Sequence, residues 1–369
     1  MVRFDCCQLG FCRVVACVYS AILEKSLISR FFVQCGGCRA ALSGRWRELT
    51  MFLGFWTAVE YWLTKPGYEC VPESSSVTSL ALASAAKRDV REARLPVGWS
   101  ETKPLHVLVG DRADARAWSG IACHVWSGKI PAGSFNELYD VHYISSPEFT
   151  FLQMAAVLDF RDAVLLGDYI CGGFAIGENG RDYVGSREPL TDPTTLAAYL
   201  DRAKGCYGID KARRALKYIV PRCASPMEVF LAVEFSLPLK EGGWGMPHIE
   251  ANERIDLDSR LWSLAGADHY FGDLYFPTVK GDVEYDSYEF HTGSHRLDHT
   301  AERRNILEAT GVGTVSATWG QIDSFDKFSA FVWATKKRFG IRQKTYSDEV
   351  RCAQLELYEH LMNRTRRMF

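Results

Sequence analysis

The sequence predicts an α/β protein in which a mixed sheet is flanked by helices and preceded by a mainly helical region. Two observations support this prediction. Helix-like and strand-like segments follow one another in the order α-β-β-β-α-β across residues 221–340, and such an alternation folds into a sheet covered by helices. The composition, with 47% hydrophobic and 13% aromatic residues, is typical of a folded globular protein, and 369 residues suffice for about two or three domains.

The segment at 221–340 begins with a predicted helix at 225–237, because Ser225 is a good N-cap and Pro226 suits the first helical position. Three strands are predicted next, at 248–257, 268–276 and 280–287. They precede a helix, a β-branched strand and a long helix, at 297–310, 312–318 and 322–339. A basic helical tail is predicted at 341–369.

Residues 51–220 are predicted to be mainly helical. The predicted helices lie at 52–63, 146–158, 162–170, 193–204 and 209–219. Two strands are predicted in this region, at 105–109 and 122–126. An Ala-rich stretch at 78–92 carries three basic side chains and is the best candidate for a DNA-recognition helix, with an ordinary amphipathic helix as the alternative.

Residues 1–50 differ from the rest of the chain. Six of the twelve cysteines lie in the first 38 residues, and Cys35 and Cys38 have zinc-knuckle spacing without a second pair to complete four ligands. Asp5 and Arg13 interrupt the apolar run, which is too short to span a membrane and lacks a signal-peptide pattern. We interpret 1–50 as an N-terminal extension, with Met51 as an alternative start. The other cysteines are scattered, which fits a reducing cytoplasm.

Charge is distributed unevenly although the net charge is only −2. Residues 268–289 contain six acidic residues and one basic residue, whereas the chain from residue 336 onward contains nine Lys or Arg and four Asp or Glu. An acidic pocket beside a basic tail suits a metal site next to a phosphate backbone. The alternative is a solvated, charged helix at the C-terminus.

The acidic residues form a pattern on two neighbouring predicted strands. Asp273 lies on the first strand, Glu284 and Asp286 lie on the second, and His291 follows. Because side chains alternate along a strand, Asp282 shares a face with the latter two acids, although its position suggests a turn residue rather than a ligand. A cluster of hard oxygen ligands is what Mg²⁺ needs, and a bound cation can activate water against a phosphodiester. The alternatives are a turn for the first acid and an exposed strand face for the others.

This order of elements and acids resembles the restriction-endonuclease-like PD-(D/E)xK superfamily, and more closely its very-short-patch-repair-like branch. Domains of that branch carry an aspartate strand, Glu-x-Asp, His, a helix with Arg and Leu, and a further strand. The matching positions are Asp273, Glu284-Tyr285-Asp286, His291, Arg303-Arg304 with Leu307, and the strand at 312–318. The likeness covers about residues 221–340. Residues 146–219 resemble the middle region of abortive-infection-type antitoxin proteins, which often join such domains.

The resemblance implies a role for each matching residue. Asp273 and Glu284 would hold Mg²⁺ or Mn²⁺, and Glu228 would be the acidic residue that such domains often present from the preceding helix. His291 would act as a general base or hold a phosphate. Glu228 also lies three residues after Ser225, so a helix-capping role alone is the alternative.

Three further positions bear on the resemblance. Arg303 and Arg304 would contact the DNA backbone or stabilise charge in the transition state, with surface salt bridges as the alternative. The superfamily usually has Lys two residues after the Glu, and that position is Asp286 here. Water activation would therefore depend on the metal, on His291 or on a lysine from elsewhere.

Two function classes follow from these residues. The first is a metal-dependent DNA endonuclease or nicking enzyme, in phage defence or DNA repair. The second is a non-catalytic, DNA-binding, antitoxin-like regulator that keeps the nuclease fold. The expected partners are DNA and a toxin or defence-system protein, with no membrane. A purely structural role in protein contacts is a third interpretation.

Overall fold

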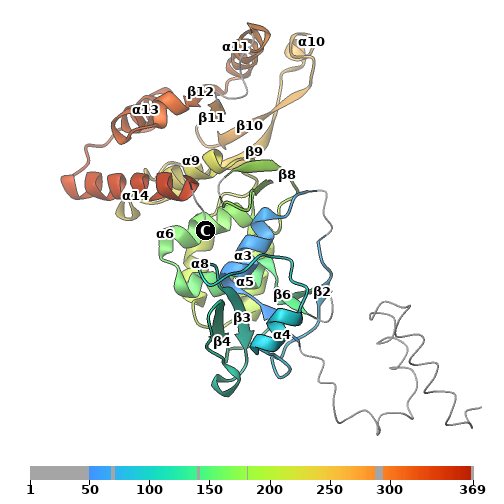
Figure 1. Ribbon diagram of the computed structural model, residues 1–369. Coiled ribbons are helices and arrows are strands. Elements are labelled where there is room, and N and C mark those ends of the chain that lie inside the picture. The colour runs from blue at the N-terminus through green and yellow to red at the C-terminus, as the bar shows by residue number, and fades with distance from the viewer. Residues whose placement is uncertain (1–49, 68–70, 139–141, 181, 287–293, 367–369) are drawn as a thin grey trace, which may run out of the picture.

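The computed structural model describes residues 50–67, 71–138, 142–180, 182–286 and 294–366. The protein is a mixed α/β structure with two main sheets, which lie toward opposite ends of the molecule with helices between them (Figure 1). The interpretation of 1–50 as an extension falls almost entirely outside the described residues.

The N-terminal part contains a six-stranded mixed sheet in the order β2-β5-β6-β1-β3-β4. Its strands are β1 (Phe52–Leu53), β2 (Ser74–Ser75), β3 (Leu105–Val109), β4 (Ile121–Val125), β5 (Phe135–Glu137) and β6 (Tyr143–Ser145). Only β3 and β4 correspond to predicted strands. The prediction of a mainly helical region therefore needs correction, because it missed a sheet whose other strands are only two or three residues long. Such strands are too short for an alternating pattern to be recognised.

Helices pack against this sheet and against one another. They are α3 (Phe55–Thr64), α4 (Lys87–Glu92), α5 (Pro147–Val157), α6 (Phe160–Ile170), α7 (Pro193–Arg202) and α8 (Ile209–Leu216). The predicted N-cap at Ser146 is confirmed, since its side chain accepts a hydrogen bond from the Phe149 backbone N–H. The Ala-rich stretch at 78–92 is helical only over α4, its last six residues, so the helix expected across the whole stretch does not form. A small hairpin, β7 (Phe174–Ile176) with β8 (Tyr183–Ser186), completes this part.

The C-terminal part is built on a four-stranded sheet in the order β12-β11-β10-β9. Its strands are β9 (Glu250–Asp256), β10 (His269–Phe276), β11 (Gly281–Asp286) and β12 (Gly313–Thr318). The first three strands are antiparallel, and β11 pairs with β12 in parallel. The sheet is therefore mixed, as predicted.

Of the helices of this part, the four longer ones lie where the sequence placed them, and two helices of four residues each were not predicted. They are α9 (Pro226–Ser236), α10 (Trp262–Ala265), α11 (Ser294–Ala309), α12 (Trp319–Ile322), α13 (Phe325–Arg338) and α14 (Asp348–Arg366). Helix α11 forms the connection between the parallel strands β11 and β12. The basic tail is helical over α14, which buries Leu357 and Leu361 against the rest of the fold and is not merely a solvated helix.

One large cluster of buried side chains runs from Phe52 in the N-terminal part to Met362 in α14, so both parts share a core. A second cluster lies around β1, β3 and α3, and a third lies between the C-terminal sheet and α11. Among the described helices, none is both long enough and apolar enough to cross a membrane.

Candidate active site on the C-terminal sheet

The two predicted metal ligands lie side by side on adjacent strands. Leu274 of β10 pairs with Val283 of β11, which places Asp273 and Glu284 at the next position of the same antiparallel ladder. The backbone N–H of Tyr285 donates a hydrogen bond of 2.9 Å to Asp273 Oδ2. The hairpin predicted from the sequence thus brings these two acids together.

Both carboxyl groups are held in surroundings that disfavour their charge. Burial raises the pKa of Glu284 to about 7, with a further contribution from the neighbouring Asp273. Burial also raises the pKa of Asp273, and the Asp286 charge adds to that increase. The positive charge of Arg303 opposes this increase in pKa. Its Nη2 lies 2.8 Å from Glu284 Oε1 in an ion pair.

Asp282 lies next to these acids and corrects the sequence prediction of a turn residue. It is part of β11 and completely buried, and neither of its carboxyl oxygens has a hydrogen-bond donor among the described residues. Burial and the charges of Glu284 and Asp273 raise its pKa well above the usual value. Gly272 makes space for it, since a Cβ atom at that position would lie 2.6 Å from Asp282 Oδ1.

Of the two predicted basic residues, only Arg303 belongs to this cluster. Besides its ion pair with Glu284, its guanidinium donates to the Phe271 carbonyl and lies 5.3 Å from the ring centroid of Tyr270. These contacts hold the guanidinium group against the sheet. Arg304 is exposed on α11 and makes no comparable contact among the described residues, so the structure does not bring it to the acids.

Glu228 approaches the cluster from the start of α9. Its backbone N–H donates to Ser225 Oγ over 3.2 Å, and its carboxylate accepts hydrogen bonds from the Ala224 N–H and from Asn252 Nδ2, at 2.7 and 3.2 Å. The capping interpretation is therefore confirmed. Burial and the Asp273 charge raise the pKa of Glu228 to about 7, so the same carboxyl also faces the acids of the sheet.

The remaining predicted residues are less informative. Asp286 is half-buried at the end of β11, where it pairs with Thr318 of β12, and its charge adds to the negative field at Asp273. The residue two positions after Glu284 is therefore an acid and not a lysine. His291 lies outside the described residues.

A metal site requires ligand atoms that converge. Among the described residues, Asp159, Asp162 and His360 are the one group of three whose ligand atoms all lie within 4.8 Å of one another. Asp162 is already satisfied, because His360 Nε2 lies 2.7 Å from its Oδ1 and the Arg364 guanidinium binds both of its oxygens. We interpret this group as a polar link between α6 and α14.

The acids of the sheet converge less tightly than that group, but their chemistry fits Mg²⁺ or Mn²⁺. Mg²⁺ is commonly bound through one or two carboxylates, with water and substrate phosphate as the other ligands. Asp273 and Glu284 supply two such carboxylates, and their charges and burial raise the pKa of Asp282 beside them. Arg303 would have to share Glu284 with the cation.

Sequence reasoning missed Gly272 and Asn252, which shape this site, and it missed the burial of Asp282. Gly272 carried a signal, because glycine inside a strand often marks a close approach of another group. Asn252 holds Glu228 from a left-handed backbone conformation with φ of 49°, which Asn tolerates better than most residues. The complete burial of Asp282 depends on tertiary packing and carried no local signal.

The chain matches no family model, and neither a curated protein nor a solved structure is significantly similar to it.

Proposed function

We propose that the C-terminal sheet carries a metal-dependent nuclease-type site that hydrolyses phosphodiester bonds in DNA. The supporting observation is an excess of buried carboxyl groups over cations. Four buried acidic side chains influence one another, namely Glu228, Asp273, Asp282 and Glu284, and the charge of Arg303 acts on the last three. Such a cluster must take up protons or a cation, and a divalent cation would satisfy it at neutral pH.

Each residue of the cluster would have its own role. Asp273 and Glu284 would hold the cation, and Glu228 would close the cluster from the side of α9. When bound, the cation would lower the pKa of a water molecule and polarise the phosphodiester. Arg303 would place its positive charge next to the scissile phosphate, where charge develops during hydrolysis.

A cleavage assay tests the proposal. Supercoiled plasmid and single-stranded DNA would be incubated with the full chain in Mg²⁺, Mn²⁺ or EDTA, beside Glu284→Gln and Asp273→Asn. A matched control is Glu308→Gln, since Glu308 is an exposed acid on α11 that pairs with Arg338. We expect metal-dependent cutting by the wild type and the control and none by the two site variants. Equal cutting by all four proteins, or no cutting by folded wild type in either metal, would contradict the proposal.

A second candidate function is a non-catalytic DNA-binding regulator, related in role to antitoxins and acting with a toxin or defence-system protein. Two observations favour it. Arg303 pairs with Glu284, where the nuclease would need a cation, and Asp286 replaces the usual lysine. The regulator should bind DNA with an affinity that falls steeply with salt and is unchanged in Glu284→Gln.

A further inference from the structure

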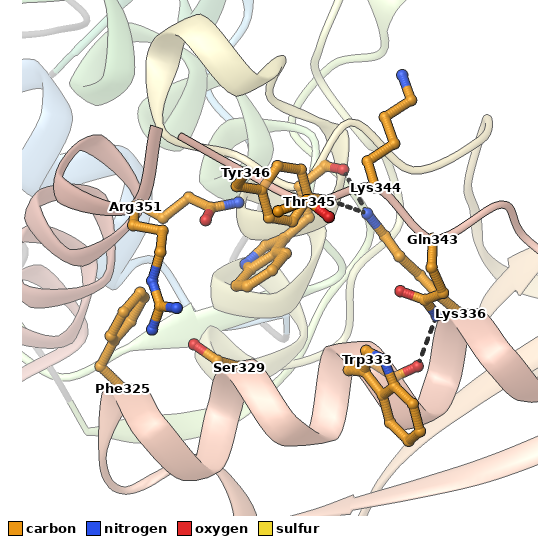
Figure 2. Close-up of a pocket in the computed structure, with 11 residues that line it drawn as sticks. Phe325, Ser329, Trp333, Lys336, Gln343, Lys344, Thr345, Tyr346 and Arg351 are labelled. Atoms are coloured by element: carbon orange, nitrogen blue, oxygen red, sulfur yellow. Dashed lines mark hydrogen bonds between the residues drawn. The ribbon is translucent and has the colours of Figure 1, made fainter. Parts of the chain in front are cut away.

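A cationic cavity, separate from the acidic cluster, lies between α13, the segment that follows it and α14 (Figure 2). Its volume is about 270 Å³, and none of the eleven residues that line it is acidic. They are Trp244, Phe325, Ser329, Trp333, Lys336, Gln343, Lys344, Thr345, Tyr346, Arg351 and Gln354. None of the acidic-cluster residues lines this cavity, so the two sites are separate.

Lys336 is the buried cation of the cavity, with 5% of its surface exposed. Its ammonium donates hydrogen bonds of 2.9 Å to the Trp244 carbonyl and to the Tyr346 hydroxyl, as the dashed lines in Figure 2 mark. Both acceptors are neutral, and an ammonium has three N–H donors. The ammonium also lies 5.6 Å from the ring centroids of Trp244 and Tyr346, so its partners among the described residues are all uncharged.

Arg351 adds a second positive charge from α14. Figure 2 shows its side chain reaching toward Phe325, whereas Lys344 extends away from the other lining side chains. Guanidinium and ammonium groups together are the usual protein ligands of phosphate. No carboxylate among the described residues forms an ion pair with Lys336 or Arg351, so neither charge is neutralised within the fold.

The other walls of the cavity are aromatic and polar. Phe325, Trp244 and Tyr346 provide ring surfaces on which a planar group can stack. Ser329 Oγ and Gln354 Nε2 are buried without a hydrogen-bond partner among the described residues. Gln354 as a whole is only 1% exposed. Buried polar atoms of this kind are normally paired, so a ligand with polar edges would satisfy them.

We propose that this cavity binds a single phosphorylated nucleotide, either free or at the end of a nucleic-acid strand. The phosphate would lie at Lys336 and Arg351, the base would stack on the aromatic walls, and Gln354 would hydrogen-bond to a base edge. The volume lies just below the roughly 300–1,000 Å³ of typical ligand sites, which suits one nucleotide rather than a duplex. This inference goes beyond the proposed hydrolysis and does not depend on it.

Calorimetric titration of the full chain tests the inference. The ligands would be nucleoside monophosphates, the corresponding nucleosides, inorganic phosphate, and a short single strand with or without a 5′-phosphate. We expect the monophosphates to bind at least tenfold more tightly than nucleoside or phosphate alone. A 5′-phosphorylated strand that binds equally well would identify a strand end as the ligand, and a preference for the monophosphate would identify a free nucleotide.

Variants make the test specific. Arg351→Ala should weaken monophosphate binding about tenfold, which is typical for loss of a charged hydrogen bond. Arg342→Ala removes the same charge from an exposed neighbour that does not line the cavity, and should leave binding unchanged. Equal losses in both variants, phosphate binding as tight as nucleotide binding, or no binding by folded wild type would each overturn the inference. Glu284→Gln should bind nucleotide normally, so failure of the nuclease proposal would remain distinguishable.

Discussion

The acidic cluster should make the stability of the metal-free protein depend on pH through Glu284. The pKa of this carboxyl is raised from 4.5 to about 7 by burial, and its side chain is only 12% exposed. Each tenfold change in proton affinity corresponds to about 1.4 kcal/mol, so ionising Glu284 in the folded protein costs about 3 kcal/mol. Because the folded state keeps this proton to higher pH than the unfolded chain, stability is greatest below pH 4.5, falls up to pH 7 and is constant above.

Glu284→Gln removes this titration while keeping the shape of the side chain. The free energy of unfolding would be measured by urea denaturation at pH 5 and pH 8 in EDTA. Between these pH values, we expect the wild type to lose roughly 2–3 kcal/mol more than the variant. The exposed Glu308→Gln variant should follow the wild type, and Mg²⁺ at pH 8 should stabilise the wild type but not Glu284→Gln. An identical difference between wild type and Glu284→Gln at both pH values would refute the reasoning.

Two further predictions concern positions around the cluster. Gly272→Ala should lower the free energy of unfolding by about 1–3 kcal/mol, because its Cβ would collide with the buried carboxyl beside it, whereas Gly320→Ala has no atom within 4 Å and should be tolerated in the same denaturation assay. Ser225→Ala should cost about 1 kcal/mol through loss of the helix cap, and it should reduce DNA cleavage less than Glu228→Gln, because it removes only one hydrogen bond to the Glu228 carboxylate. Glu228→Gln should instead reduce cleavage while thermal unfolding shows little loss of stability, and the reverse outcome would assign Glu228 to capping alone.

The strands and the four longer helices of the C-terminal part could be predicted because they had strong local signals, whereas the four-residue helices α10 and α12 were not predicted. Ser225 and Pro226 mark the start of α9, and the β-branched run of β12 follows the glycine that ends α11. The N-terminal sheet gave no such signal. Its strands β1, β2, β5 and β6 have two or three residues each and are defined by pairing with distant segments, such as Phe52 with Tyr143. Long-range pairing of this kind cannot be read from local periodicity.

For the site, strand alternation and a short hairpin were sufficient to bring Asp273 and Glu284 together. The same pattern could not distinguish Arg303 from Arg304, because neighbouring residues on a helix point in different directions and only the packing of α11 decides which one faces the sheet. The burial of Asp282 likewise follows from tertiary packing and not from its local sequence. The sequence pattern therefore predicted which acids lie side by side, whereas tertiary packing determined which groups surround them.

The two sites of the C-terminal part are opposite in charge, and this opposition bears on the function of the whole. Ionised groups are rarely buried without a partner, because removing them from water costs several kcal/mol each. Here Asp282 lacks a donor at one site, and Lys336 lacks a carboxylate at the other. The first imbalance is relieved by a cation and the second by an anion.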